Sequence, residues 1–96
     1  MSTLNPTSVQ RNDLDILRRR ILYRAAHRGT KELDWLLGRY AEAEIAAMDE
    51  PDLVAFEEFL ALPDPDIHHW LMAPDAVRPQ GPAGEFVTRL KRFHDL

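Results

Sequence analysis

Hydrophobic side chains recur along most of this chain at intervals of three and four residues, the spacing of an amphipathic α-helix. The first apolar stripe, within residues 13–27, consists of Leu14, Leu17, Ile21 and Ala25, widened by Ile16 and Leu22. The second, within residues 30–48, consists of Leu33, Leu37, Tyr40, Ala41, Ile45 and Met48, with Leu36 at its edge. No useful length of sequence alternates with the period of two that marks a half-buried strand. The pattern therefore predicts helices that turn these stripes toward a shared core.

Capping residues predict where the helices begin and end. Asn12 or Asp13 is a suitable N-cap for the first helix. The second helix is expected to open at Gly29 or Thr30, and Gly38 would allow a kink or break within it. These signals divide the first half of the chain into two helices.

Two more starts follow in the second half of the chain. Asp49 is a predicted N-cap with Asp52 three residues later, and Asp64 is a predicted N-cap with Pro65 at the first helical position. A connector rich in proline and glycine covers residues 73–84. The predicted core residues of the last three helices are Leu53, Phe56, Phe59 and Leu60, then Ile67, Trp70 and Leu71, then Phe86, Val87, Leu90 and Phe93. The sequence thus predicts an all-α, single-domain bundle of about five helices over residues 13–96, after a flexible polar tail over residues 1–12.

Composition excludes several classes of function. The 96 residues include no cysteine, which excludes disulfides, thiolate metal sites and cysteine nucleophiles. Apolar runs are far shorter than the roughly 20 residues that span a bilayer. There is no glycine-rich phosphate loop, and adjacent His68 and His69 on a helix would point about 100° apart, too far to share a metal ion. We expect a cytoplasmic bacterial protein that is not an enzyme, binds no metal and does not insert into a membrane.

Charge is distributed unevenly, although the net charge is only −4. Basic residues dominate residues 11–31, whereas residues 32–66 are acidic apart from Arg39. One interpretation is solvated helix faces with intramolecular pairing. Another is that a patch steers a partner, because complementary fields raise association rates. A third is a nucleic-acid-binding helical module or generic adaptor that uses the Arg18–Arg28 face.

The junction between the first two helices carries an arginine, a glycine and a glutamate, Arg28, Gly29 and Glu32. Gly29 can end the first helix in a left-handed conformation, and Glu32 suits the first turn of the second. Trp35 lies outside the apolar stripe of that helix, on the same side as Glu32. Because interfaces favour arginine and aromatic anchors, the junction is a candidate docking feature.

Two motifs give the chain a resemblance to a known family. The stretch RGxxELD begins with Arg28, Gly29 and Glu32, and DPDIxxW runs from Asp64 to Trp70. In this order, separated by an acidic helix, they resemble the succinate dehydrogenase flavinylation and assembly factors over about residues 16–73.

The resemblance implies a small helical assembly factor that binds the flavoprotein subunit of succinate dehydrogenase, and of fumarate reductase as a further client. Such a factor promotes covalent attachment of FAD to a client histidine, binds no cofactor stably itself and is expected to be a monomer when free. Arg28, Gly29 and Glu32 inherit a client-binding role from the motif, whereas Asp34 and Arg24 are placed near the corner by helical spacing. Two positions depart from the family pattern: His68, where an aromatic residue is frequent, and Trp35, where a smaller apolar residue is frequent.

Overall fold

The structure, a computed structural model, describes the backbone of residues 6–96 and the side chains of residues 13–96. The described chain is helical and contains no strand, which confirms the all-α fold. The elements are α1 (Pro6–Ala26), α2 (Lys31–Glu44), the short 3₁₀ helix η1 (Ile45–Ala47), α3 (Glu50–Leu60), α4 (Asp64–Met72) and α5 (Pro82–Phe93).

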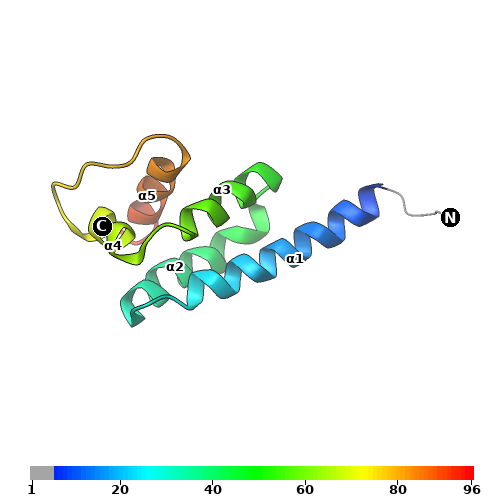
Figure 1. The fold of residues 1–96 in the computed structure, drawn as a ribbon, viewed down its shortest axis with the longest axis horizontal. Helices are drawn as coiled ribbons and strands as arrows, with labels where there is room; N and C mark the ends of the chain where they lie inside the picture. Colours follow the sequence, from blue (N-terminus) through cyan, green and yellow to red (C-terminus); the bar gives the residue numbers. More distant parts are fainter. Residues whose placement is uncertain (1–5) are drawn as a thin grey trace.

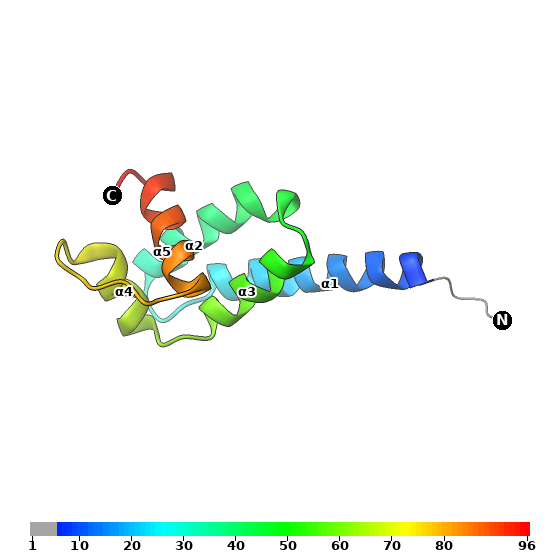
Figure 2. The same cartoon turned by 90° about the horizontal axis from the view of Figure 1, so that it is seen from above.

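Helices α1, α2 and α3 run back and forth, with α2 and α3 both packed against α1, and α4 and α5 lie at the end of these helices where the α1–α2 loop turns (Figure 1). The amino-terminal part of α1 extends past the other helices (Figure 2). Thus two loops that are far apart in sequence, α1–α2 and α3–α4, come to the same end of the molecule.

Aromatic rings join three of the helices in the core. Phe56 of α3 is fully buried, stacks on Phe86 of α5 with ring centroids 5.0 Å apart, and meets the edge of Tyr40 of α2 at 5.6 Å. Burying side chains of this size stabilises a domain by about 1.5–3 kcal/mol each. The predicted stripes of the second and third helices are buried throughout.

The capping pattern is confirmed for α3 and shifted for α1 and α4. Asp49 caps α3 by accepting a hydrogen bond from the Asp52 amide at 3.1 Å. Helix α1 begins at Pro6, so Asn12 and Asp13 lie inside the helix and the predicted N-cap there is wrong. Proline is well suited to a first helical turn because it lacks the amide hydrogen that would be unpaired there. Of the predicted polar tail, residues 6–12 are therefore helical, and residues 1–5 lie outside the described residues.

Two apolar positions were assigned to the core wrongly. Ile16 is 57% exposed because it lies about 140° around α1 from the buried Ile21. Phe93, near the end of α5, is 42% exposed even though its ring meets Tyr40 edge-on.

Gly38 does not break α2, which is continuous from Lys31 to Glu44. A Cβ atom at this position would lie 3.3 Å from both the Cα and the Cβ atom of Ala26. The glycine therefore lets α2 approach α1 closely.

Candidate functional site

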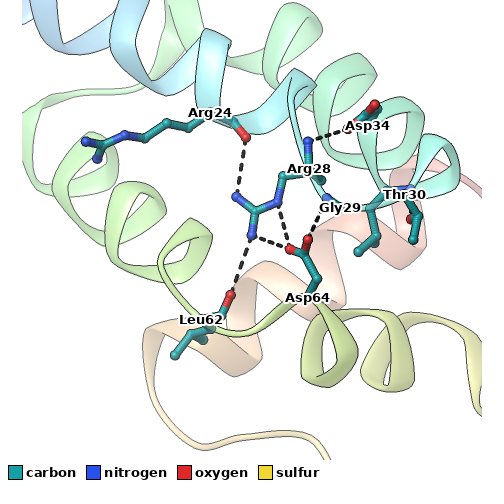
Figure 3. Close-up of polar contacts among 8 residues, drawn as sticks. Arg24, Arg28, Gly29, Thr30, Asp34, Leu62 and Asp64 are labelled. Atoms are coloured by element: carbon teal, nitrogen blue, oxygen red, sulfur yellow. Dashed lines mark hydrogen bonds and ion pairs between the residues drawn. The ribbon is translucent and has the colours of Figure 1, made fainter.

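The candidate site is the corner where the α1–α2 loop meets the start of α4 (Figure 3). Its centre is the carboxylate of Asp64, which accepts hydrogen bonds from Arg28 Nε at 2.9 Å, Arg28 Nη2 at 2.7 Å and the Gly29 amide at 2.7 Å. One carboxylate thus ties together two segments separated by more than thirty residues of sequence.

The guanidinium group of Arg28 is occupied within the molecule. Besides Asp64, it donates to the carbonyl oxygen of Arg24 at 3.3 Å and, more weakly, to that of Leu62 at 3.5 Å. The Arg28 side chain is only 8% exposed. Through these hydrogen bonds Arg28 links the end of α1 to the α3–α4 junction.

Gly29 is needed for space and not for a left-handed backbone. Among the described residues Gly81 is the one glycine with positive φ, so the left-handed conformation predicted for Gly29 is wrong. A Cβ atom on Gly29 would lie 2.9 Å from Asp64 Oδ2, closer than side chains tolerate. The glycine lets the Asp64 carboxylate reach the backbone amide.

Asp34, in the first turn of α2, and Thr30, the N-cap residue of α2, complete the turn. The Asp34 carboxylate accepts a hydrogen bond from the Arg28 amide, and the Thr30 hydroxyl accepts one from the Leu33 amide at 3.2 Å. Thr30 has extended φ and ψ of −133° and 154°, as expected of an N-cap. The predicted start of the second helix at Gly29 or Thr30 is therefore confirmed at Thr30, and Asp34 fixes the turn.

Glu32 differs from its neighbours because it faces outward. Its side chain is 51% exposed, and its carboxylate lies 2.7 Å from His68 Nε2. Beside this pair is an open groove of about 320 Å³, lined by Thr30, Leu33, Asp64, Pro65 and His68. The corner therefore presents an accessible carboxylate at the edge of a mostly apolar groove.

Arg24 lies near the corner, but its guanidinium points to α3. Arg24 Nη1 lies 2.9 Å from Glu57 Oε2, and Arg20 makes two further hydrogen bonds to the same carboxylate, at 2.6 and 3.1 Å. The hydrogen bond from Arg20, together with the positive charges of Arg20 and Arg24, holds the pKa of Glu57 below its ordinary value against the opposing effect of burial.

The basic face of α1 is thus partly neutralised from within. Arg18 adds hydrogen bonds to the carbonyl oxygens of Met48 at 3.0 Å and Ile45 at 3.4 Å. This is the intramolecular pairing expected from the first interpretation of the charge pattern. It leaves fewer guanidinium groups of the Arg18–Arg28 face available to phosphate than the sequence suggests.

Trp35 is 54% exposed, as its position outside the stripe predicts. Its ring lies 6.0 Å from the Arg39 guanidinium carbon and 5.0 Å from the His94 ring. Together with Glu42 and Phe93 these residues line a separate groove of about 410 Å³. This groove is larger than the one at the corner, but the groups of the RGxxE motif do not converge on it, so we take the corner as the candidate site.

Sequence reasoning missed that Asp64 lies at the centre of the corner and that His68 contacts Glu32. The signal for Asp64 was present, since it precedes a proline at a helix start, but that pattern predicts a cap for α4. In the structure Pro63 is the N-cap residue of α4, and the Asp64 carboxylate bonds across to Arg28 and Gly29. A capping role for Asp64 is therefore wrong.

The described residues contain no group of three histidine or acidic side chains able to hold a metal ion. Nor is any helix in this part of the chain long and apolar enough to cross a membrane.

The corner and its motifs can be compared with known proteins. The model of the family described as the flavinator of succinate dehydrogenase matches residues 19–94. The chain belongs to this family. The flavinator match includes both halves of the corner, from Arg24 to His68.

Relatives in the flavinator family come from bacteria and eukaryotes. The chain is 39% identical over 70 residues to the FAD assembly factor SdhE of Acetobacter pasteurianus, a match that covers 73% of this chain and 64% of the relative. It is 36% identical over 61 residues to the mitochondrial succinate dehydrogenase assembly factor 2 of Dictyostelium discoideum, covering 64% of this chain and 43% of the relative. The chain is 32% identical over 76 residues to the protein of the same name from Yarrowia lipolytica, a match that covers 79% of this chain and 52% of the relative. The chain thus spans between about two fifths and two thirds of the length of these relatives, and no solved structure matches it significantly.

Proposed function

We propose that this flavinator-family protein is an assembly factor that binds the flavoprotein subunit of succinate dehydrogenase and promotes covalent attachment of FAD to a histidine of that subunit. The observation that carries the proposal is the architecture of the corner. The Arg28 guanidinium and the Gly29 backbone amide are hydrogen-bonded to the Asp64 carboxylate, whereas Glu32 stays exposed beside a groove. The names of its relatives, FAD assembly factor and succinate dehydrogenase assembly factor, point to the same client.

In this proposal the residues of the corner have two roles, to hold its structure and to contact the client. Arg28, Gly29 and Asp34 hold the corner in one shape, because their polar groups are bonded within the molecule. Glu32 meets the client, because its carboxylate is accessible and can accept hydrogen bonds from donors there. Arg24 supports the corner from behind through its carbonyl oxygen and through its ion pair with Glu57.

The chemical step belongs to the client and its flavin. The histidine ring nitrogen and a flavin methyl carbon each lose one hydrogen as they bond, and the flavin itself takes up the two electrons released. The factor contributes by holding a client conformation in which the two reacting atoms are aligned, and such alignment can lower a barrier by several kcal/mol. A rigid corner suits this task because it loses little conformational entropy on binding. The factor itself is not an enzyme in this account and keeps no FAD of its own.

The proposal extends to three properties of the protein. It acts in the bacterial cytoplasm, it is a monomer before it meets the client, and the flavoprotein subunit of fumarate reductase is a second client. The monomeric state and the second client are tested with the same purified proteins.

The test is covalent flavin in the client. A succinate dehydrogenase flavoprotein subunit is produced with and without this protein in a host that lacks its own factor, then denatured and examined for in-gel flavin fluorescence. We expect strong fluorescence only with the factor present. Equal fluorescence in both samples would contradict the proposed function.

A further inference from the structure

The corner contains one polar contact that the roles given above do not use. His68 of α4 and Glu32 of α2 are 36 positions apart in sequence, yet Nε2 of the histidine lies 2.7 Å from Oε1 of the glutamate. Their side chains are 44% and 51% exposed. The contact lies at the surface beside the corner groove and is neither part of the core nor a helix cap.

The fixed part of the corner brings these two side chains together. The bonds of Asp64 to Arg28 and Gly29 hold the first turn of α4 against the start of α2. His68 follows Asp64 by four residues, so it stands on the same face of α4, one turn further on. The position of His68 opposite Glu32 is therefore imposed by the hydrogen bonds between Asp64 and the α1–α2 loop.

The contact adds little to stability but removes freedom from Glu32. Exposed ion pairs and hydrogen bonds contribute only about 0–1 kcal/mol to folding. A free glutamate side chain samples several rotamers, and losing that freedom on binding weakens a complex. A glutamate that a neighbouring residue already holds in one rotamer loses less conformational entropy when it binds its partner.

Among the described residues, no other polar side chain at the corner holds Glu32 in this way. Arg28 and Asp64 are bonded to each other. Within residues 13–96, Lys31, Asp66 and His69 make no hydrogen bond or ion pair with either member of the pair. Within the described residues, His68 is therefore the one side chain whose hydrogen bond orients the Glu32 carboxylate.

We propose that His68 is a positioning residue, which holds the carboxylate of Glu32 at the edge of the corner groove in the orientation that the client flavoprotein meets. The proposal rests on the proposed function, because it gives His68 an effect on the client that acts through Glu32. The effect depends on the hydrogen bond from Nε2 of His68 to Glu32. A side chain that places an amide nitrogen at a similar distance should therefore fulfil the same role.

A double-mutant cycle with a purified succinate dehydrogenase flavoprotein subunit tests this. The dissociation constant of the complex is measured for the wild type, Glu32→Ala, His68→Ala and the double variant, and the rate of covalent flavin formation is measured for the wild type and His68→Ala. We expect His68→Ala to weaken binding about two- to fivefold, as removal of about 0.5–1 kcal/mol predicts. In the Glu32→Ala background the same change has no further effect.

Two more variants separate positioning from a general effect on structure. His68→Gln keeps a donor near Nε2 and is expected to bind within twofold of the wild type. His69→Ala removes the adjacent exposed histidine, which makes no hydrogen bond or ion pair with Glu32, and serves as the matched control. Thermal unfolding followed by circular dichroism should be the same for all variants, because none of these side chains is buried.

The possible outcomes distinguish the two proposals. If Glu32→Ala abolishes flavinylation but His68→Ala binds like the wild type, the positioning role is wrong and the proposed function stands. If His68→Ala is equally harmful with and without Glu32, then His68 contacts the client itself and the positioning role is again wrong. If the wild-type protein neither binds the client nor raises its covalent flavin, the proposed function fails and the role of His68 fails with it.

Discussion

Asp64 holds the corner together, and the change Asp64→Asn removes that function while keeping the shape of the side chain. Oδ1 of Asp64 accepts both bonds from Arg28, and Oδ2 accepts the bond from the Gly29 amide. An asparagine carries one oxygen and one amide nitrogen. Whichever way it is turned, a donor faces a donor.

The magnitude follows from the burial of the pair. Breaking a fully buried ion pair by removing one partner destabilises a protein by about 3–5 kcal/mol. Arg28 is 8% exposed but Asp64 is 27% exposed, so water reaches part of the pair. We therefore expect Asp64→Asn to lower the free energy of unfolding by about 2–3 kcal/mol, with one neutral hydrogen bond retained.

The assay is urea unfolding at pH 7 followed by helical circular dichroism, with Asp66→Asn as the matched control. Asp66 lies in the same first turn of α4 and is exposed, so both changes remove a similar interaction with the helix dipole, about 0.3–1 kcal/mol. The reasoning is refuted if the two variants differ in unfolding free energy by less than about 0.5 kcal/mol.

Three further predictions concern the packing of the corner and the ion pairs of α1. Gly29→Ala should destabilise the protein by about 1–2 kcal/mol, because its Cβ displaces the Asp64 carboxylate; in an Asp64→Ala background, measured by the same urea assay, the effect should largely vanish. Gly38→Leu should lower the unfolding free energy by about 3 kcal/mol or more, because the new side chain separates α2 from α1; a loss below about 1 kcal/mol would contradict the close approach. The pKa of Glu57 is lowered on folding by Arg20, so its contribution to stability is present above its unfolded pKa and is lost as pH falls through its folded pKa. The difference in urea midpoint between wild type and Glu57→Gln should therefore shrink from pH 6 to pH 3, whereas Glu58→Gln, at the exposed neighbouring position, should show no such trend.

The helices could be predicted from the sequence because each has a local cause. The stripe of α2 is buried throughout, and Asp49 caps α3 as its spacing with Asp52 predicts. The start of α1 could not be predicted, because Asn12 and Asp13 are residue types that often cap helices but here lie inside the helix. A cap preference of about 1 kcal/mol does not end a helix that other interactions continue.

The site was predictable only in part, for a different reason. The motif picked out Arg28, Gly29 and Glu32, but the partner of Arg28 and Gly29 is Asp64, in another loop. Nothing in the local sequence of Asp64 distinguishes a cap from a cross-link, since both need a short acidic side chain at a helix start. Only the packing of α4 against the α1–α2 loop decides between them.

The same packing changes what the arginine of the motif does. From sequence, the motif gives Arg28 a client-binding role. In the structure its donors are taken by Asp64 and by backbone carbonyl oxygens, so it holds the corner while Glu32 remains accessible. Loss of function on changing Arg28 or Gly29 would thus be accompanied by loss of stability, whereas a change of Glu32 separates the two.

The most direct test of the account is therefore the covalent flavin content of the client with Glu32→Ala as the factor. We predict in-gel flavin fluorescence at the level seen without any factor, from a variant whose unfolding free energy lies within about 1 kcal/mol of the wild type. Wild-type fluorescence with Glu32→Ala would contradict the claim that this carboxylate acts on the client.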